Sequence, residues 1–363
     1  MSTAAGLSVF GHAMLTAVGA DGPATCAAMR AGINGARRAK LWDFTVGEDL
    51  NAARPRLHQW WEGPTMTAPL AIPVITECAQ RAAQLGMAPA SADALALPVL
   101  VILPPAERPF RAADLEPMVM SDLARHWGGA LPAGSGTIAG GRTGILTALQ
   151  VADGLIGRHG APGCIIVGVE SFLRQVIVAH YMRRRRLKCG TNSNGFLPGE
   201  AACAVLVGRS GAFDADELRI QGIGVGREAS GDGGNENDPV LGDGLTQAMQ
   251  QAIEMAQVPF FDLNFTVSDH NGERFKFKEA AIAAGRLDRL PPEGVSRRPK
   301  GHVETWHPAQ SIGEVGAAIF PCLLGWAFEA GAKAYAPSHH ALLHAGEDNG
   351  ERVALVTAFE RRG

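Results

Sequence analysis

The sequence predicts an α/β protein, and three observations support this class. A short strand-like run, Thr137-Ile138, leads into glycines, and apolar residues at helical spacing then follow from residue 145 to residue 156. Residues 164–169 form an uninterrupted apolar run, typical of a strand that is buried on both faces. The chain has 363 residues, of which 46% are hydrophobic and 19% are charged, so it can bury a large core. A strand, a turn, a helix and a second strand in this order predict a parallel-sheet unit.

The two halves of the chain show a similar order of elements. In the first half we expect a strand over residues 7–10, a helix over residues 26–30 and a strand over residues 165–169. The second half has strands over residues 218–225 and 265–267, separated by a helix over residues 245–255. This order suggests two stacked βαβ-rich layers that arose by duplication, with residues 1–213 forming one half and residues 214–363 the other.

The charge and the cysteines narrow the range of functions. A net charge of −3 argues against a general nucleic-acid or membrane-surface role, and no apolar run approaches the ~18 residues of a spanning helix. The six cysteines are scattered without metal-ligand spacing, so we expect reduced thiols, no metal and a cytoplasmic protein. The glycine run at residues 222–226 lacks the spacing of a dinucleotide fingerprint, and we expect no cofactor.

One basic run stands apart from this pattern. Arg183, Arg184, Arg185 and Arg186 are consecutive, and Lys188 follows them. Such a run is either a solvated face or a surface that meets a phosphate-bearing or acidic partner. Both interpretations remain open from the sequence.

Four segments follow one another in a fixed order that points to one family. They are residues 137–171, the stretch Asn194 to Ala202 (NGFLPGEAA), residues 242–272 with the sequence VSDHNG at their end, and residues 310–318 (QSIGEVGAA). These segments resemble the nucleophile turn, the "GFxxGEGA" stretch and the two histidine loops of β-ketoacyl synthases, members of the thiolase-like superfamily. The resemblance implies a five-layered αβαβα thiolase-like fold made of two duplicated halves, and usually a homodimer.

The resemblance places an arginine where the family has its nucleophile. Counting without gaps from Thr137-Ile138, and back from Gly168, the position of the cysteine that takes the acyl group falls on Arg142. No cysteine occurs between residues 79 and 163. Because a guanidinium is permanently charged and has no acceptor, it cannot carry an acyl group. Condensation by the family mechanism is therefore not expected.

The two family histidines are also only partly kept. The first falls on His270, although Asn271-Gly272 departs from the usual motif, and the second falls on Glu314. The lysine that normally precedes the second histidine falls on Ala309. His270 and Glu314 are thus the candidate catalytic residues, with a hydrogen-bonded structural role as the alternative for His270.

We expect Arg142 and Glu314 to form a bidentate or water-bridged ion pair, because a cation at a helix N-terminus attracts a carboxylate. The pair has two interpretations. It either plugs a dead active site, or it opens so that Arg142 receives a substrate carboxylate or phosphate.

Other residues near these motifs are candidates for substrate binding. Phe196 could equally be a core aromatic, and Ser268-Asp269, with Glu273-Arg274, could lie on an exposed loop or line the pocket. The candidate substrate-binding residues are Arg142, Thr143, Phe196, Ser268 and Asp269, and the candidate partner-binding residues are Arg183, Arg184, Arg185 and Arg186.

Two functions remain open. The first is a non-condensing ketosynthase-like protein that binds an acyl thioester, an acyl carrier protein or a condensing ketosynthase partner in fatty-acid or polyketide-type metabolism. The second is a repurposed acyltransferase or thioester hydrolase that uses His270 and Glu314 on substrates such as acyl-CoA.

Overall fold

The computed structural model describes residues 6–57, 61–89, 95–229, 239–289 and 294–362. One ten-stranded sheet has the order β10-β9-β11-β12-β8-β1-β7-β6-β4-β5. A separate two-stranded ribbon is formed by β2 and β3. The strands are β1 (Leu7–Leu15), β2 (Ala36–Asp43), β3 (Glu48–Ala53), β4 (Val99–Leu103), β5 (Gly136–Ala139), β6 (Cys164–Ser171), β7 (Glu200–Arg209), β8 (Glu217–Arg227), β9 (Phe265–Ser268), β10 (Glu304–Trp306), β11 (His340–Gly346) and β12 (Glu351–Glu360).

The predicted strand-turn-helix-strand unit is present. Strands β5 and β6 both pair in parallel with β4, which lies between them. The middle of the sheet is antiparallel, because β6 pairs with β7 and β7 pairs with β1 in that sense. The sheet as a whole is therefore mixed.

The two halves of the chain contribute strands in the same spatial order. Reading inward from each edge, β5-β4-β6-β7-β1 matches β10-β9-β11-β12-β8. The two runs meet where β1 pairs with β8, at Ser8 with Arg219 and at Val9 with Leu218. The strand order thus repeats within the sheet, with its centre at this junction.

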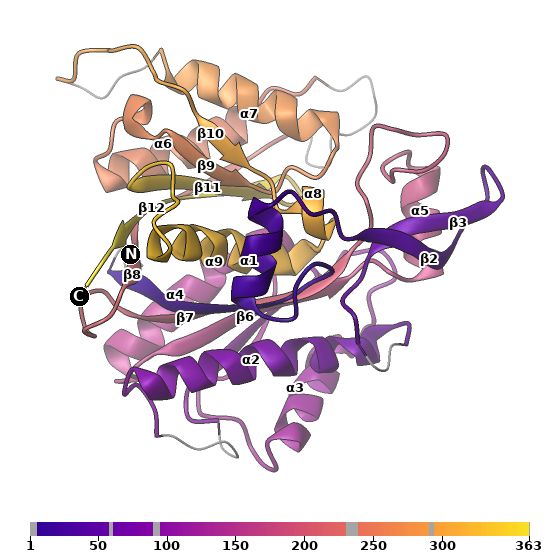
Figure 1. The fold of residues 1–363 in the computed structure, drawn as a ribbon, viewed down its shortest axis with the longest axis horizontal. Coiled ribbons are helices and arrows are strands. Elements are labelled where there is room, and N and C mark those ends of the chain that lie inside the picture. The colour runs from indigo at the N-terminus through magenta and orange to yellow at the C-terminus, as the bar shows by residue number, and fades with distance from the viewer. Residues whose placement is uncertain (1–5, 58–60, 90–94, 230–238, 290–293, 363) are drawn as a thin grey trace.

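Helices cover the two runs of strands on both sides and also separate them, which gives the predicted five layers (Figure 1). Helices α4 and α9 lie in the middle, within the largest apolar cluster. Helices α2 and α3 cover one run of strands, and α6 and α7 cover the other. The helices are α1 (Gly22–Arg30), α2 (Thr67–Gln84), α3 (Leu115–His126), α4 (Ile145–Arg158), α5 (Gln175–Arg183), α6 (Asp243–Ala256), α7 (Arg274–Leu287), α8 (Ala309–Ile312) and α9 (Ile319–Ala332).

The glycine run at residues 222–226 has a packing role. Gly222, Gly224 and Gly226 lie at alternate positions of β8, so all three face the same side of the sheet. A side chain at any of them would collide with backbone carbonyl oxygens of α6. These glycines let α6 lie directly on the strand. The glycine run, which looks like a nucleotide-binding loop in the sequence, is therefore explained by helix packing.

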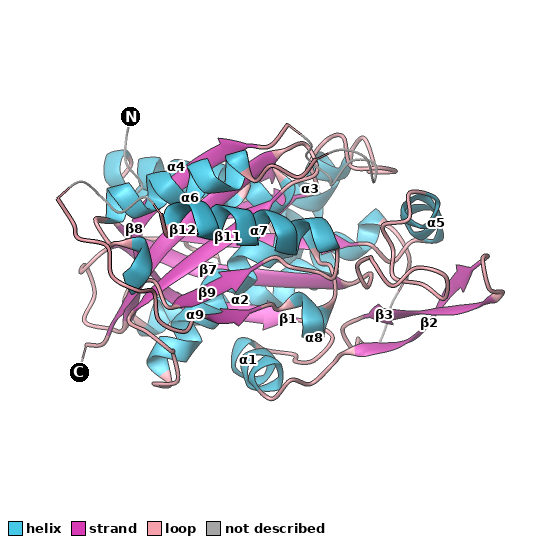
Figure 2. Cartoon of the chain, turned by 90° about the horizontal axis from the view of Figure 1, so that it is seen from above, coloured by secondary structure: helices cyan, strands magenta, loops and turns pink. Residues whose placement is uncertain are grey.

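The ribbon β2–β3 projects from the layered body together with α5, as Figure 2 shows. Trp42, Phe44 and Val46 on the ribbon are each about half exposed, at 50%, 46% and 47%. Across the described ranges, no helix is long and apolar enough to span a membrane.

Candidate functional site

Arg142 lies in a tight turn between β5 and α4, as predicted. The turn is a single 3-10 turn over Gly141–Thr143, and α4 begins directly after Gly144. Gly141 has a φ of +54°, and a side chain there would collide with the carboxylate of Glu347. Position 141 therefore needs glycine for two reasons: the backbone is left-handed there, and the carboxylate of Glu347 leaves no room for a side chain.

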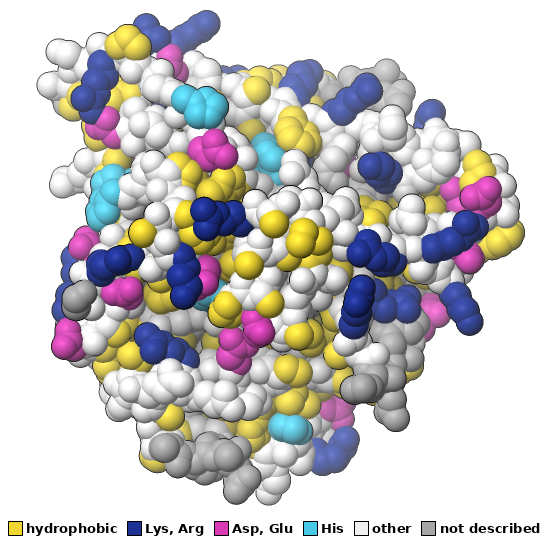
Figure 3. Space-filling model, viewed as in Figure 1, with side chains coloured by type: hydrophobic (Ala, Val, Ile, Leu, Met, Phe, Trp, Pro, Cys, Tyr) yellow, Lys and Arg dark blue, Asp and Glu magenta, His cyan; other side chains and the backbone are white. Residues whose placement is uncertain are grey.

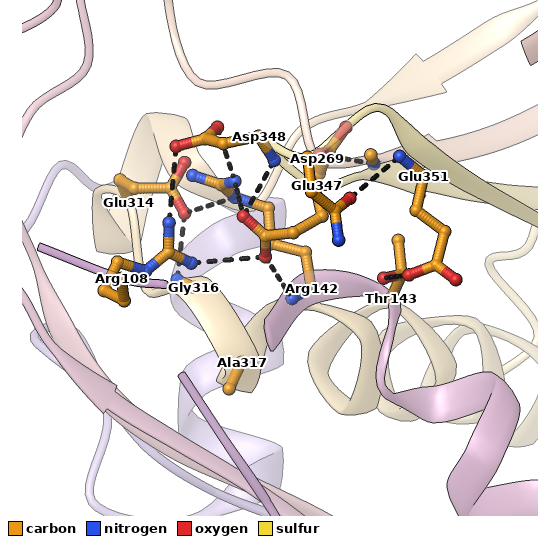
Figure 4. Close-up of polar contacts among 12 residues, drawn as sticks. Arg108, Arg142, Thr143, Asp269, Glu314, Gly316, Ala317, Glu347, Asp348 and Glu351 are labelled. Atoms are coloured by element: carbon orange, nitrogen blue, oxygen red, sulfur yellow. Dashed lines mark hydrogen bonds and ion pairs between the residues drawn. The ribbon is translucent and has the colours of Figure 1, made fainter. Parts of the chain in front are cut away.

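The Arg142 side chain is 1% exposed and is surrounded by three carboxylates (Figure 4). Its Nε donates to Glu314 Oε1 at 3.1 Å. Its Nη1 donates to Glu347 Oε1 at 2.9 Å and to Asp348 Oδ1 at 3.1 Å. The remaining nitrogen, Nη2, is buried without a hydrogen-bond partner. An Arg142–Glu314 ion pair is present, but it is a direct contact through one nitrogen, so the predicted bidentate or water-bridged geometry is wrong.

Glu314 is fixed by three donors. In addition to Arg142, the backbone amide of Gly316 donates to Oε1 at 2.9 Å, and Asn271 Nδ2 donates to Oε2 at 2.5 Å. Burial raises the pKa of Glu314, but the charges of Arg142 and Lys276 and the hydrogen bond from Asn271 outweigh it, so that the pKa lies below its ordinary value. Glu314 is held as an ionised carboxylate with both oxygens occupied.

Glu347 and Asp348 were missed by the sequence analysis. They lie in the turn Glu347–Gly350 that joins β11 to β12, in a part of the chain without clear motifs. The turn is closed by Gly350, whose amide donates to the carbonyl of Glu347 at 3.1 Å. An acidic pair before Asn349-Gly350 in a strand-to-strand turn was the available signal, but it reads as an ordinary exposed hairpin.

Two more arginines extend the network around Asp348. Arg108 donates to Glu170 at 2.8 Å, to Glu347 at 3.2 Å and to Asp348 at 3.3 Å. Arg186 contacts Asp348 through two nitrogens at 3.0 and 3.1 Å. The three arginines hold the pKa of Asp348 well below its ordinary value, although burial opposes them.

The prediction that Arg186 meets a partner requires correction. Its guanidinium is buried and forms a bidentate pair with Glu273, with distances of 2.6 and 3.1 Å. Arg183, Arg184 and Arg185 are exposed. The surface part of the run therefore ends at residue 185, because the chain turns inward there: Arg185 has a φ of +54°.

The internal network contains more acids than bases. Its cations are Arg108, Arg142 and Arg186, and its carboxylates are Glu170, Glu273, Glu314, Glu347 and Asp348. The carboxylate of Glu170 accepts hydrogen bonds from Arg108 and from the backbone amide of Ala317. Burial raises its pKa. A network of this kind holds its members rigidly in place, because removing one charge leaves its partners buried and unpaired.

His270 follows β9, as expected, but makes no contact with Glu314 that would form a catalytic pair. Its ring is 6% exposed, and both ring nitrogens are buried without hydrogen-bond partners. It packs against Phe277, His307 and His344, with ring centroids 4.4, 4.7 and 5.5 Å away. Burial, and then the neighbouring histidines, hold the pKa of His270 well below its ordinary value. The imidazole is therefore neutral near pH 7.

The predicted substrate-binding residues are all buried. Thr143 donates to Glu351 at 2.6 Å, Ser268 contacts His307 Nδ1 at 2.8 Å, and Asp269 is paired with Lys276. Phe196 packs with Phe172 and Tyr181 in a buried aromatic cluster. Of its two predicted roles, it therefore has that of a core aromatic. As in the Arg142 network, these side chains already have internal partners.

An open groove of about 580 Å³ lies beside this region. Its walls come from the β2–β3 ribbon, the loop that contains Lys188 and Cys189, and the loop of His270, Asn271 and Gly272. His270 and Asn271 thus connect the groove to the buried network, since Asn271 donates to Glu314. Neither Arg142 nor Glu314 lines the groove.

The cysteines do not supply a nucleophile at the turn. Cys26, Cys78, Cys164, Cys203 and Cys322 are buried, and burial raises the pKa of the Cys164 thiol to about 12. Cys189 is half-buried and lines the groove. Within the described ranges, no group of three or more His, Cys, Asp or Glu side chains is arranged to hold a metal ion.

Comparison with solved structures gives the fold its class. The chain matches a ketosynthase in complex with its chain length factor from Xenorhabdus doucetiae with a TM-score of 0.72 and 11% identity, over 99% of both chains. It matches a β-ketoacyl synthase from Burkholderia phymatum with a TM-score of 0.64 and 15% identity, over 98% of this chain and 100% of the other. The protein has the thiolase-like fold of the ketosynthases.

A third match is a chain from the structure of a complex. In that complex a type II acyl carrier protein binds its ketosynthase, which is bound to the hexaketide. The TM-score of this match is 0.71 at 13% identity, over 97% of this chain and 98% of the other. No family model matches the chain, and no curated protein sequence matches it.

Proposed function

We propose that this protein is a non-condensing ketosynthase-like protein that binds an acyl thioester or its carrier in fatty-acid or polyketide-type metabolism. The observation that carries the proposal is the buried guanidinium of Arg142, which is held by Glu314, Glu347 and Asp348. The sequence resemblance aligns this residue with the nucleophile of ketosynthases. Such a residue can neither attack a thioester nor be released without leaving charged groups buried. Its role is to plug the site.

The groove beside the plug is the proposed binding site. Its volume of about 580 Å³ is in the range of small-molecule sites, and Lys188, Asn271 and the backbone around Gly272 supply polar groups. A pantetheine arm, with its amides and its narrow aliphatic segments, suits such a groove. In this arrangement the thioester would lie near His270 and would not be cleaved.

Arg183, Arg184 and Arg185 are proposed to guide an acidic carrier protein to the groove. Arg183 is the last residue of α5, and Arg184 and Arg185 follow it directly. Arg183 lies over the ring of Phe44 in the β2–β3 ribbon, 5.8 Å from the ring centroid. Figure 3 shows Lys and Arg side chains spread over this face, including the projecting region at the right, and mixed with acidic residues. The matched structures hold ketosynthases with a chain length factor or an acyl carrier protein, which supports partners of this kind. A homodimer stays a separate part of the proposal.

The alternative is an acyltransferase or hydrolase that uses His270 and Glu314. The unpaired imidazole of His270 favours it, because a neutral histidine beside a groove can accept a proton. Glu314 argues against it, since both its oxygens are occupied and its low pKa makes it a weak base. The non-condensing role is therefore the better supported.

A binding experiment tests the proposal. Titration of the full chain with octanoyl-CoA and with an octanoylated acyl carrier protein should give binding without turnover, and carrier binding should weaken as salt increases. Replacing Arg183, Arg184 and Arg185 by Glu should weaken carrier binding at least tenfold. The same change at the exposed Arg125, on α3, should leave it unchanged. Absence of binding to both ligands would refute the proposal.

A further inference from the structure

A second pocket lies between α7 and the strands β9 and β11. Its volume is about 310 Å³. Helix α7 contributes Ala280, Ala281 and Ala284 to its lining, and the strands contribute Thr266 from β9 and Leu342 from β11. The other lining residues are Met249, Phe260, His270, Phe277, Lys300, Val303, Thr305, His307 and His344. The lining surface of this slot is mostly apolar, and the small alanine side chains of α7 leave room for an unbranched chain.

The pocket and the groove share two side chains. His270 and Phe277 line both, and their rings pack together at 4.4 Å. Phe277 is 43% exposed, although it is a large apolar residue. The two rings therefore form the partition between the polar groove and the apolar slot.

His270 marks this partition as a place for a polar group. Both of its ring nitrogens are buried without a partner, which costs free energy that a bound hydrogen-bonding group would recover. A neutral imidazole has one donor and one acceptor, so it suits a carbonyl or an amide and does not require an ion.

Lys300, a cation that lines the slot, is already occupied. Lys300 Nζ donates to the backbone carbonyls of Phe260 and Leu263, the latter at 2.9 Å, and it lies 3.5 Å from the centroid of the Phe260 ring. Because the Lys300 ammonium already has these partners, an uncharged methyl end fits the slot better than a carboxylate.

From these contacts we infer that the slot beneath α7 receives the aliphatic chain of an acyl thioester whose pantetheine arm lies in the groove, with the thioester carbonyl at His270 and Phe277. The inference rests on the proposed function and adds the substrate class: unbranched acyl groups of medium length. Each methylene buried in the slot should tighten binding about fourfold until the slot is full.

The test measures binding of free CoA, acetyl-CoA, hexanoyl-CoA, octanoyl-CoA and hexadecanoyl-CoA to the full chain by calorimetry. Two variants on α7 are compared. Ala281→Trp fills the slot from an exposed position, and Lys278→Trp places the same ring on the same helix outside the slot. Circular dichroism confirms that both variants are folded.

We expect octanoyl-CoA to bind at least 100-fold more tightly than free CoA. Ala281→Trp should remove this gain and leave the affinity for free CoA unchanged, whereas Lys278→Trp should alter neither. Binding of all five ligands with equal affinity, or a gain that survives Ala281→Trp, would overturn the inference and leave the proposed function in place. Binding of none of them would overturn both.

Discussion

Arg142 and Glu347 are joined twice. The backbone amide of Arg142 donates to Glu347 Oε2 at 2.9 Å, and its guanidinium donates to Oε1 of the same carboxylate at 2.9 Å. The two residues lie 205 positions apart in the sequence. One carboxylate from the last hairpin therefore fixes both the backbone of the turn and the guanidinium of Arg142. The plug depends on contacts between the first and the last part of the sheet.

Replacing Arg142 by Met should strongly destabilise the fold. The change leaves the buried carboxylates of Glu314 and Glu347 without their shared cation, which typically costs about 3–5 kcal/mol. Urea unfolding at pH 7 measures the effect. The matched change at Arg125, whose pair with Asp122 is on the surface, should alter the free energy of unfolding by less than about 1 kcal/mol. A similar small change for Arg142→Met would contradict the network's role.

Glu314→Ala should affect stability and leave ligand binding nearly unchanged. The variant leaves Arg142 Nε, the backbone amide of Gly316 and the side-chain amide of Asn271 without their acceptor. We expect the free energy of unfolding to fall by about 3 kcal/mol. The affinity for octanoyl-CoA should change less than twofold, because Glu314 does not line the groove. Glu254→Ala, on the exposed face of α6, is the control for both measurements. A large change in affinity at unchanged stability would favour the interpretation in which the pair opens for substrate.

The pH dependence of stability should carry the signature of His344. Burial lowers the pKa of His344 from 6.5 to about 4. Because the unfolded chain takes up this proton first, the contribution to stability is present above pH 6.5 and is lost as the pH falls towards 4. A shift of this size corresponds to about 3 kcal/mol. Unfolding measured from pH 7 to pH 4.5 should therefore be less pH-dependent in His344→Leu than in the unaltered chain. Equal slopes would show that His344 titrates normally.

Much of the fold and part of the site could be predicted from the sequence. The turn at Arg142 is local, since glycines and a helical repeat within one segment define it, and the Arg142–Glu314 contact follows from two motifs of one resemblance. The acids of the last hairpin could not be found in this way. Glu347 and Asp348 reach Arg142 only because β11 and β12 place their turn over the start of α4, a relationship that exists in three dimensions alone.

The arginine run shows a second limit of sequence reasoning. Four adjacent arginines look equivalent, yet Arg183, Arg184 and Arg185 are exposed while Arg186 is an internal partner of Glu273 and Asp348. The difference arises from the left-handed backbone at Arg185, which no charge pattern reveals. Glu273 likewise proved to be buried, while its neighbour Arg274 is exposed.

Two glycine substitutions should have opposite effects. Gly224→Ala drives a methyl group into the backbone of α6 at the carbonyl of Ala248, and we expect a loss of several kcal/mol or failure to fold. Gly285 lies inside α7 with open space around it, so Gly285→Ala should stabilise the protein by about 0.5–1 kcal/mol. Thermal unfolding of both variants measures the difference. Equal and small effects would contradict the close packing of α6 on β8.

The most direct test of the plugged site is the intact mass of the full chain after incubation with acetyl-, malonyl- and octanoyl-CoA, while free thiol is measured in parallel. We predict no covalent adduct under denaturing conditions, no release of thiol, and a complex with octanoyl-CoA that is visible only in the native spectrum. A covalent adduct would contradict the account by revealing a nucleophile elsewhere in the chain. Release of thiol without an adduct would contradict it in favour of a hydrolase or transferase that uses His270.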